Sequence, residues 1–83
     1  MIKLNYIHEY VTLAETLNFS RTAELMFMTQ PALSRHISAL EEEIGVKLFV
    51  RNTRHVELTD AGKAVYERFR EMIDSFRNAK EQA

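Results

Sequence analysis

The chain has 83 residues, with two glycines, one proline and no cysteine. A chain of this size has room for one small core, and without cysteine it can form neither a disulfide framework nor a thiolate zinc site. Its 11 Lys and Arg against 12 Asp and Glu leave a formal net charge of -1, whereas domains that bind nucleic acids are usually basic. The positive charge is local, however, because residues 44–56 contain Lys47, Arg51 and Arg54 and no acidic residue.

The first segment, residues 1–17, has the pattern of a surface helix rather than of a targeting sequence. Lys3, Asn5 and His8 interrupt its apolar residues, which excludes both the apolar core of a signal peptide and a membrane span. We therefore expect a cytoplasmic protein. From residue 4 to residue 17 the apolar positions recur at steps of three and four, which predicts an amphipathic helix with one buried face.

A second, shorter helix is predicted over residues 20–27. Ser20 can accept a backbone N–H bond as an N-cap, and Ala23, Met26 and Phe27 provide a short apolar face. A chain this small needs its large apolar side chains for the core. The aromatic and methionine residues that we expect there are Phe19, Met26, Phe27, Met28 and Phe49.

The third predicted helix begins at Thr29-Gln30-Pro31 and ends at Gly45. Thr29 is a good N-cap, proline is accepted only in a first helical turn, and glycine readily takes the left-handed conformation that closes a helix. The three consecutive glutamates at residues 41–43 are expected to form a solvated helix end that points away from any phosphate, because like charges repel. The apolar stripe of this helix is formed by Leu33, Ile37, Leu40 and Ile44.

Residues 46–58 predict a two-stranded wing. They are rich in β-branched and aromatic residues, and the polar centre at residues 52–55 indicates a hairpin turn. Thr59, followed by an acidic residue, then opens a last helix that runs to the chain end, because acid in the first turn suits the helix dipole. The expected fold is mainly α, with three helices and the wing over residues 1–58 and one long helix over residues 59–83.

The order of these elements matches a winged helix-turn-helix. Two short helices joined by three or four residues form the helix-turn-helix, in which the second helix enters the major groove of DNA. Gln can pair with adenine and Arg with guanine through two hydrogen bonds each, and Ser can reach a base or a phosphate. The apolar stripe of the third helix leaves Gln30, Ser34, Arg35 and Ser38 on other faces, near the N-terminal end of that helix. From spacing alone, Arg35 fits an ordinary solvated position as well.

Several short motifs give the chain a family resemblance. They are Gln30-Pro31-Ala32-Leu33-Ser34, Ile37 with Leu40-Glu41, Leu48-Phe49 with Arg51, and Leu58-Thr59 with Ala61-Gly62. Along essentially its whole length the sequence resembles the N-terminal domain of LysR-type transcriptional regulators. That resemblance implies sequence-specific binding of duplex DNA, transcription regulation and a homodimer held by the last helix. It also implies an effector-binding domain, which would follow residue 83 and is absent from the sequence, as the only route for a small-molecule effector.

The resemblance also assigns DNA contacts by position. It implies that the start of the third helix, from Thr29 to Arg35, lies at the major groove and that Arg54 of the wing lies in the adjacent minor groove. Arg51 is expected to bind phosphate instead. The full set of residues expected to contact DNA is Thr29, Gln30, Pro31, Ser34, Arg35, His36, Ser38, Lys47, Arg51 and Arg54.

The sequence departs from the family pattern at a few positions. Thr53 stands at the wing tip, where glycine is common, and Asn52 can supply the left-handed residue instead. Phe27 stands in the turn before the third helix, where small or polar residues are commoner. His36 stands where a polar residue is common, so a base or phosphate contact there would depend weakly on pH.

The last predicted helix also carries an apolar face. From Gly62 onward its apolar residues alternate at steps of three and four, which is the spacing of a heptad seam. Part of this face is expected to pack on the first helix, and the rest to meet a twofold-related copy. The residues expected at that interface are Val65, Phe69, Met72, Ile73 and Phe76. A twofold dimer would suit an interrupted palindrome with half-sites one DNA turn, ~34 Å, apart, whereas the alternative is a monomer whose helix folds back.

Other classes of function explain less of the sequence. His8, His36 and His55 lie on separate elements without the paired spacing of a metal site, so surface histidines are expected. Ser34 and His36 are two positions apart on one helix and cannot form a nucleophile and base pair, so we expect neither an enzyme nor a cofactor. A helical protein–protein adaptor or antisigma-like binder fits the net charge and the last helix, but it leaves the third helix and the wing unexplained.

Overall fold

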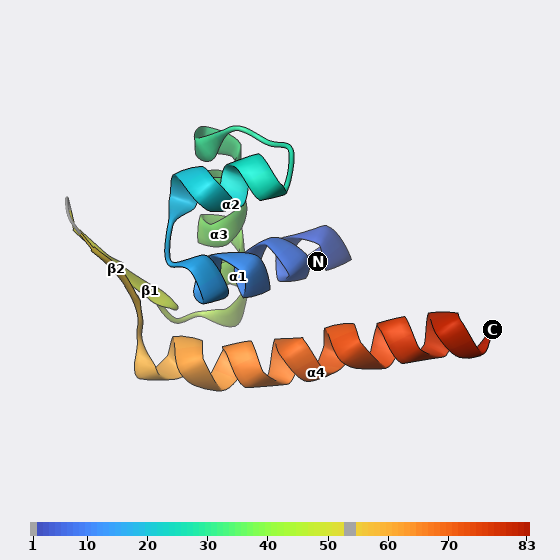
Figure 1. The fold of residues 1–83 in the computed structure, drawn as a ribbon. Coiled ribbons are helices and arrows are strands. Elements are labelled where there is room, and N and C mark those ends of the chain that lie inside the picture. The colour runs from blue at the N-terminus through green and yellow to red at the C-terminus, as the bar shows by residue number, and fades with distance from the viewer. Residues whose placement is uncertain (1, 53–54) are drawn as a thin grey trace.

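The computed structural model describes residues 2–52 and 55–83. In chain order the elements are α1 (Leu4–Thr16), α2 (Phe19–Leu25), α3 (Gln30–Ile44), β1 (Phe49–Arg51), β2 (Val56–Leu58) and α4 (Asp60–Gln82). Helices α1, α2 and α3 form one body, the β1–β2 wing projects from its side, and α4 runs past α1 and beyond that body (Figure 1). This arrangement is the mainly α winged helix-turn-helix with a long last helix that the sequence predicts.

The core lies where α1, α3 and α4 meet the start of the wing. Tyr10 of α1 is fully buried, and its hydroxyl donates to the carbonyl oxygen of Gly62 in α4. Burial, and secondarily the charge of Glu41, raise the pKa of Tyr10. Gly62 is needed at this contact, because a Cβ there would collide with the carbonyl oxygen of Leu48. The other buried apolar residues are Ile7, Val11, Leu13, Ala23, Leu33, Ile37, Leu40, Leu48, Phe49 and Ile73.

The second helix begins and ends one to two residues earlier than the sequence predicts. Asn18, not Ser20, is the N-cap: its Oδ1 accepts from the backbone N–H of Arg21 at 3.0 Å. Asn is at least as good a cap as Ser, and a cap at residue 18 brings Phe19 into the helix. The helix ends at Leu25, so residues 26–29 form the turn to α3.

Phe27 in this turn contradicts the expected core. Its side chain is 97% exposed, and its backbone has a φ of 55°. A left-handed residue reverses the chain between α2 and α3, and here the reversal carries the side chain into solvent rather than onto the body. Phe49 is buried, and the other expected core residues, Phe19, Met26 and Met28, are partly buried.

The predicted boundaries of α3 are confirmed. Thr29 Oγ1 accepts from the backbone N–H of Ala32 at 3.2 Å, and Gly45 closes the helix with a φ of 88°. The apolar stripe is buried except at its end, where Ile44 is 38% exposed.

The wing is a two-stranded antiparallel sheet in which Phe49 pairs with Leu58 and Arg51 with Val56. Next to the pair of Arg51 and Val56, the backbone N–H of Asn52 donates to the carbonyl oxygen of His55 at 3.0 Å. The wing-tip expectations for Thr53 and Arg54 fall on residues outside those that the structure describes. In the described ranges, no helix is long and apolar enough to cross a membrane.

Glu41 contradicts the expected solvated helix end. It is buried, and its Oε2 accepts from the backbone N–H groups of Leu48 and Phe49 at 2.8 and 3.2 Å. The chain reverses at Gly45 and returns along the last turn of α3, where these donors need an acceptor. Its neighbours Glu42 and Glu43 are exposed, as expected.

Candidate nucleic-acid interface

Helix α3 presents a largely polar stripe beside its buried face, and we call it the polar stripe. The stripe follows from helical spacing, since its positions are separated by one, three or four residues. Gln30, Pro31, Arg35 and Ser38 are exposed, and Ser34 between them is half-buried. Five of the positions that the sequence assigned to DNA contact therefore share one face, and Thr29 is exposed immediately before them.

Arg51 of the wing joins this stripe from a different element. Its Nη1 donates to Ser34 Oγ at 2.9 Å, and its guanidinium carbon lies 4.4 Å from the centre of the Phe19 ring. We call Phe19, Ser34 and Arg51 the Arg51 cluster. It connects α2, α3 and β1, so a cation that the sequence alone leaves unplaced is held beside the outer face of α3.

Ser20 makes a similar connection at the start of α3. Its hydroxyl oxygen accepts a hydrogen bond from the side-chain amide of Gln30. The first turns of α2 and α3 are therefore linked through side chains of the exposed surface. The sequence pattern does not indicate that Phe19 and Ser20 position side chains of this surface. Their partners, Arg51 and Gln30, lie on other elements, and no local motif marks these contacts.

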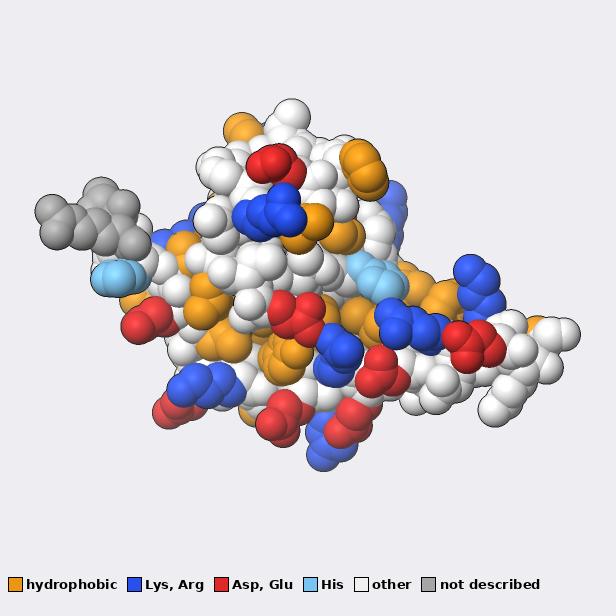
Figure 2. All heavy atoms as spheres, in the orientation of Figure 1, with side chains coloured by type: hydrophobic (Ala, Val, Ile, Leu, Met, Phe, Trp, Pro, Cys, Tyr) orange, Lys and Arg blue, Asp and Glu red, His pale blue; other side chains and the backbone are white. Residues whose placement is uncertain are grey.

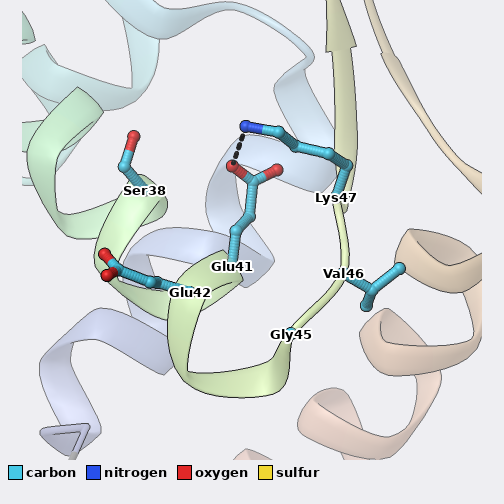
Figure 3. A pocket seen from close by; sticks show the side chains of 6 residues that line it. All are labelled: Ser38, Glu41, Glu42, Gly45, Val46 and Lys47. Atoms are coloured by element: carbon cyan, nitrogen blue, oxygen red, sulfur yellow. Dashed lines mark ion pairs between the residues drawn. The ribbon is translucent and has the colours of Figure 1, made fainter.

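Lys47 lies at the junction between α3 and the wing. Its side chain is 82% exposed, and its Nζ lies 3.8 Å from Glu41 Oε1. With Ser38 and Glu42 these residues line an open pocket into which Lys47 reaches from the loop (Figure 3). Because the ammonium group is largely in solvent, its pair with Glu41 leaves it available to an anion.

His36 is half-buried and bonded to another helix, unlike the free surface histidine that the sequence predicts. Its Nδ1 lies 2.6 Å from Glu9 Oε1, and its ring stacks on Tyr6 with centroids 4.1 Å apart. Asn5 donates to the other Glu9 oxygen at 3.3 Å. The ring thus joins α3 to α1 at the side of the polar stripe. Among the described residues, no group of three His, Cys, Asp or Glu is placed to hold a metal ion.

The expected dimer face of α4 divides into two parts. Val65 and Phe69 are half-buried against the core, and Ile73 is buried within its own chain. Met72 and Phe76 are instead 47% and 53% exposed. The structure therefore uses the first group within the chain and leaves only the second group open to a partner.

Polar contacts hold α4 against α1. Glu15 of α1 accepts a hydrogen bond from the Tyr66 hydroxyl at 2.8 Å and forms an ion pair with Arg70. The hydrogen bond to Glu15 raises the pKa of Tyr66. Arg70 also pairs with Asp74, which lies one turn further along α4. Charges of both signs alternate with exposed apolar side chains along α4 (Figure 2).

These features define a winged helix-turn-helix with an organised polar face on its second motif helix. Residues 4–63 match the family described as "Bacterial regulatory helix-turn-helix protein, lysR family". The chain therefore belongs to the LysR family of regulatory helix-turn-helix proteins, as the sequence resemblance implied.

Curated relatives agree with this assignment. The chain is 40% identical over 74 residues to the HTH-type transcriptional regulator CitR of Bacillus subtilis, which covers 89% of this chain and 25% of CitR. It is 48% identical over 66 residues to the HTH-type transcriptional regulator CatR of Pseudomonas putida, with 80% and 22% covered. The chain thus spans about a quarter of the length of these relatives.

Solved structures share the fold and include complexes with DNA. The BenM DBD in complex with catB site 1 DNA superposes with a TM-score of 0.92 at 29% identity, covering 96% of this chain and 89% of that chain. Vibrio fischeri DarR in complex with DNA gives a TM-score of 0.91 at 33% identity, covering 99% and 28%. The long last helix is included in both matches, because nearly the whole chain is covered.

Proposed function

We propose that this chain binds duplex DNA sequence-specifically as a homodimer and thereby regulates transcription. The observation that carries the proposal is the polar stripe of α3, which is exposed except for the half-buried Ser34 and is flanked by Arg51 of the wing. The complexes of BenM and DarR with DNA support it, because the same fold serves that ligand there.

In this proposal α3 enters the major groove. Arg35 and Gln30 can each form two hydrogen bonds to one base, and Ser34 and Ser38 are short enough to let the helix approach the base edges. Thr29 and Pro31 lie at the N-terminal end of the helix, which a recognition helix presents to DNA. His36 contributes less directly, because its ring is engaged by Glu9 and Tyr6.

The cations of the wing and its base would bind the DNA backbone. Arg51 and Lys47 flank the stripe from β1 and from the loop before it, where each can reach a phosphate without reading a base. Arg54 would enter the adjacent minor groove and favour a narrow, A·T-rich sequence, whose negative potential attracts a guanidinium. This local positive charge offsets the net charge of -1 of the whole chain.

The dimer would form through the distal half of α4. Met72 and Phe76 are large apolar side chains that remain about half exposed on the helix that extends past the body. A second copy offers the same apolar face in twofold symmetry, which would place two α3 helices for half-sites one DNA turn, ~34 Å, apart. Residues 1–58 would then be the DNA-binding domain and residues 59–83 the dimerisation helix of a cytoplasmic regulator.

The proposal is tested by titrating labelled duplex with the purified chain at several salt concentrations. The logarithm of the association constant should fall linearly with the logarithm of salt concentration, because each phosphate contact releases counterions. A helical adaptor for another protein would bind duplex weakly and without this slope. A flat salt response of a nucleic-acid-free preparation would therefore contradict DNA binding.

A further inference from the structure

We propose that Arg51 determines a base preference through Ser34: by donating to Ser34 Oγ, it leaves the hydroxyl as a hydrogen-bond donor, so that α3 disfavours cytosine at the base that Ser34 meets. The inference rests on the proposed binding of DNA by α3. It makes Arg51 a positioning residue for sequence readout in addition to a phosphate-binding cation.

The Arg51 side chain is turned back over the helix-turn-helix and held there from two sides. Its Nη1 bonds to Ser34, which lies 17 residues earlier, and its guanidinium carbon lies 4.4 Å from the Phe19 ring centre. A cation above an aromatic face is attracted by the negative potential of the ring. Phe19 in turn meets the buried Phe49 ring edge-on, with centroids 6.5 Å apart. The guanidinium is therefore placed by contacts that reach the core.

The direction of the hydrogen bond between Arg51 and Ser34 is fixed by chemistry. A guanidinium has five N–H donors and no acceptor, whereas a serine hydroxyl has one donor and two lone pairs. Ser34 must accept in this contact, so one lone pair is occupied and its O–H remains to be donated elsewhere. A bond from a charged donor is also stronger than one between neutral groups, which favours its persistence at the surface.

A hydroxyl held in this way discriminates between base edges. In the major groove adenine and guanine present N7, guanine also O6, and thymine O4, all of which accept a hydrogen bond. Cytosine presents its N4 amino group, which donates. The second lone pair of Ser34 remains able to accept from cytosine, but the cytosine amino group would then lie beside the N–H donors of the Arg51 cation, which repel its hydrogens. An accepting base edge meets no such repulsion. The cluster therefore converts a tolerant contact into a selective one.

Lys47 provides a matched control. It is also a cation at the base of the wing, but its ammonium group faces Glu41 rather than Ser34. Removing it should weaken binding to all duplexes through a lost phosphate contact, without changing the preference at any base. Arg51→Met is the main variant, because it keeps an unbranched side chain over Phe19 and removes every donor. Arg51→Ala serves as a second variant.

The experiment starts from a duplex that is selected from random DNA by its binding to the protein. Dissociation constants are measured at one salt concentration for this duplex and for variants in which each base pair of one half-site is replaced in turn by the other three. For the unchanged protein, cytosine should weaken binding on the order of 5-fold at one position, the size of a single hydrogen bond. Ser34→Ala should remove that penalty. Arg51→Met should weaken binding to all duplexes and also remove the penalty, and Lys47→Ala should keep it. Thermal unfolding checks that each variant is folded.

Two results would overturn the inference. If Ser34→Ala leaves the base preference unchanged at every position, the Ser34 hydroxyl contacts no base. If Arg51→Met and Arg51→Ala both keep the cytosine penalty, Arg51 acts only as a charge. Failure of the proposed function is distinguishable from both, because the unchanged protein would then bind the selected and a scrambled duplex equally well.

Discussion

Helices α3 and α4 are both amphipathic, but only one of them has its apolar face completed by its own chain. Leu33, Ile37 and Leu40 of α3 are almost completely buried, and the opposite face is polar. On α4, Ile73 is buried whereas Met72 and Phe76 remain about half exposed. A monomer therefore buries every large apolar group on the central turns of α3 but leaves Met72 and Phe76 of α4 about half exposed.

The polar contacts of the two helices differ in the same sense. On the outer face of α3, Ser20 bonds to the exposed Gln30 and Arg51 bonds to the half-buried Ser34. The contacts of α4 join it to Glu15 of α1 and end before its distal half. Substitutions on the outer face of α3 should thus change binding, those on distal α4 should change assembly, and only those on the inner faces should change folding.

The largest expected effect is on folding. Ile37→Ala should lower the free energy of unfolding by about 2–5 kcal/mol, because it removes a fully buried branched side chain and leaves a cavity. Ile44→Ala is the matched control on the same helix, since Ile44 is 38% exposed and should cost much less. Urea unfolding measures both. Equal losses of stability at the two positions would contradict the structure, in which Ile37 is buried and Ile44 is partly exposed.

The second effect concerns assembly. Met72→Asp with Phe76→Asp should give a folded monomer in sedimentation, because charge on both copies of a shared apolar face opposes pairing. Binding to a palindrome should weaken on the order of 100-fold, as expected when two linked sites become independent, and binding to a half-site should change little. A double variant that stays dimeric would place the interface elsewhere. Phe69 is a poorer choice for this test, because it packs edge-on against Tyr10.

A smaller effect is expected where α3 meets the wing. Glu41→Ala should lower the free energy of unfolding by about 1–3 kcal/mol, because it leaves the buried N–H groups of Leu48 and Phe49 without their acceptor. Glu42→Ala is the control, since Glu42 is exposed, and it should change stability by less than about 0.5 kcal/mol. Similar values for the two variants in urea unfolding would rule out a structural role for the Glu41 carboxylate.

The sequence predicted what is decided locally. The N-cap Thr29, the first-turn Pro31 and the closing Gly45 act within a few residues, and together with helical spacing they define α3 correctly. The predicted start of α2 was wrong because Asn18 and Ser20 lie two residues apart and both are good N-caps. Local signals rank such caps poorly, and packing decides between them.

The errors at single side chains have a different cause. Most of them arise from contacts with residues that are far away in the sequence. Glu41 is buried because residues 48 and 49 come back to it, and His36 is engaged because Glu9 lies 27 residues earlier. Phe27 is exposed because of a left-handed backbone residue that composition does not reveal. On α4, heptad spacing shows an apolar face but cannot assign Ile73 to the same chain and Phe76 to its open side.

The most direct test of whether the polar stripe of α3 reads the DNA sequence is the variant Arg35→Ala. Dissociation constants are measured for the selected duplex, for its single base-pair variants and for nonspecific DNA. Arg35→Ala should lose about 1–3 kcal/mol of discrimination at one base pair and keep the stability of the fold, because Arg35 is exposed. Lys47→Ala should weaken binding to all sequences alike. If both variants weaken specific and nonspecific binding by one common factor, α3 is not the element that reads the sequence.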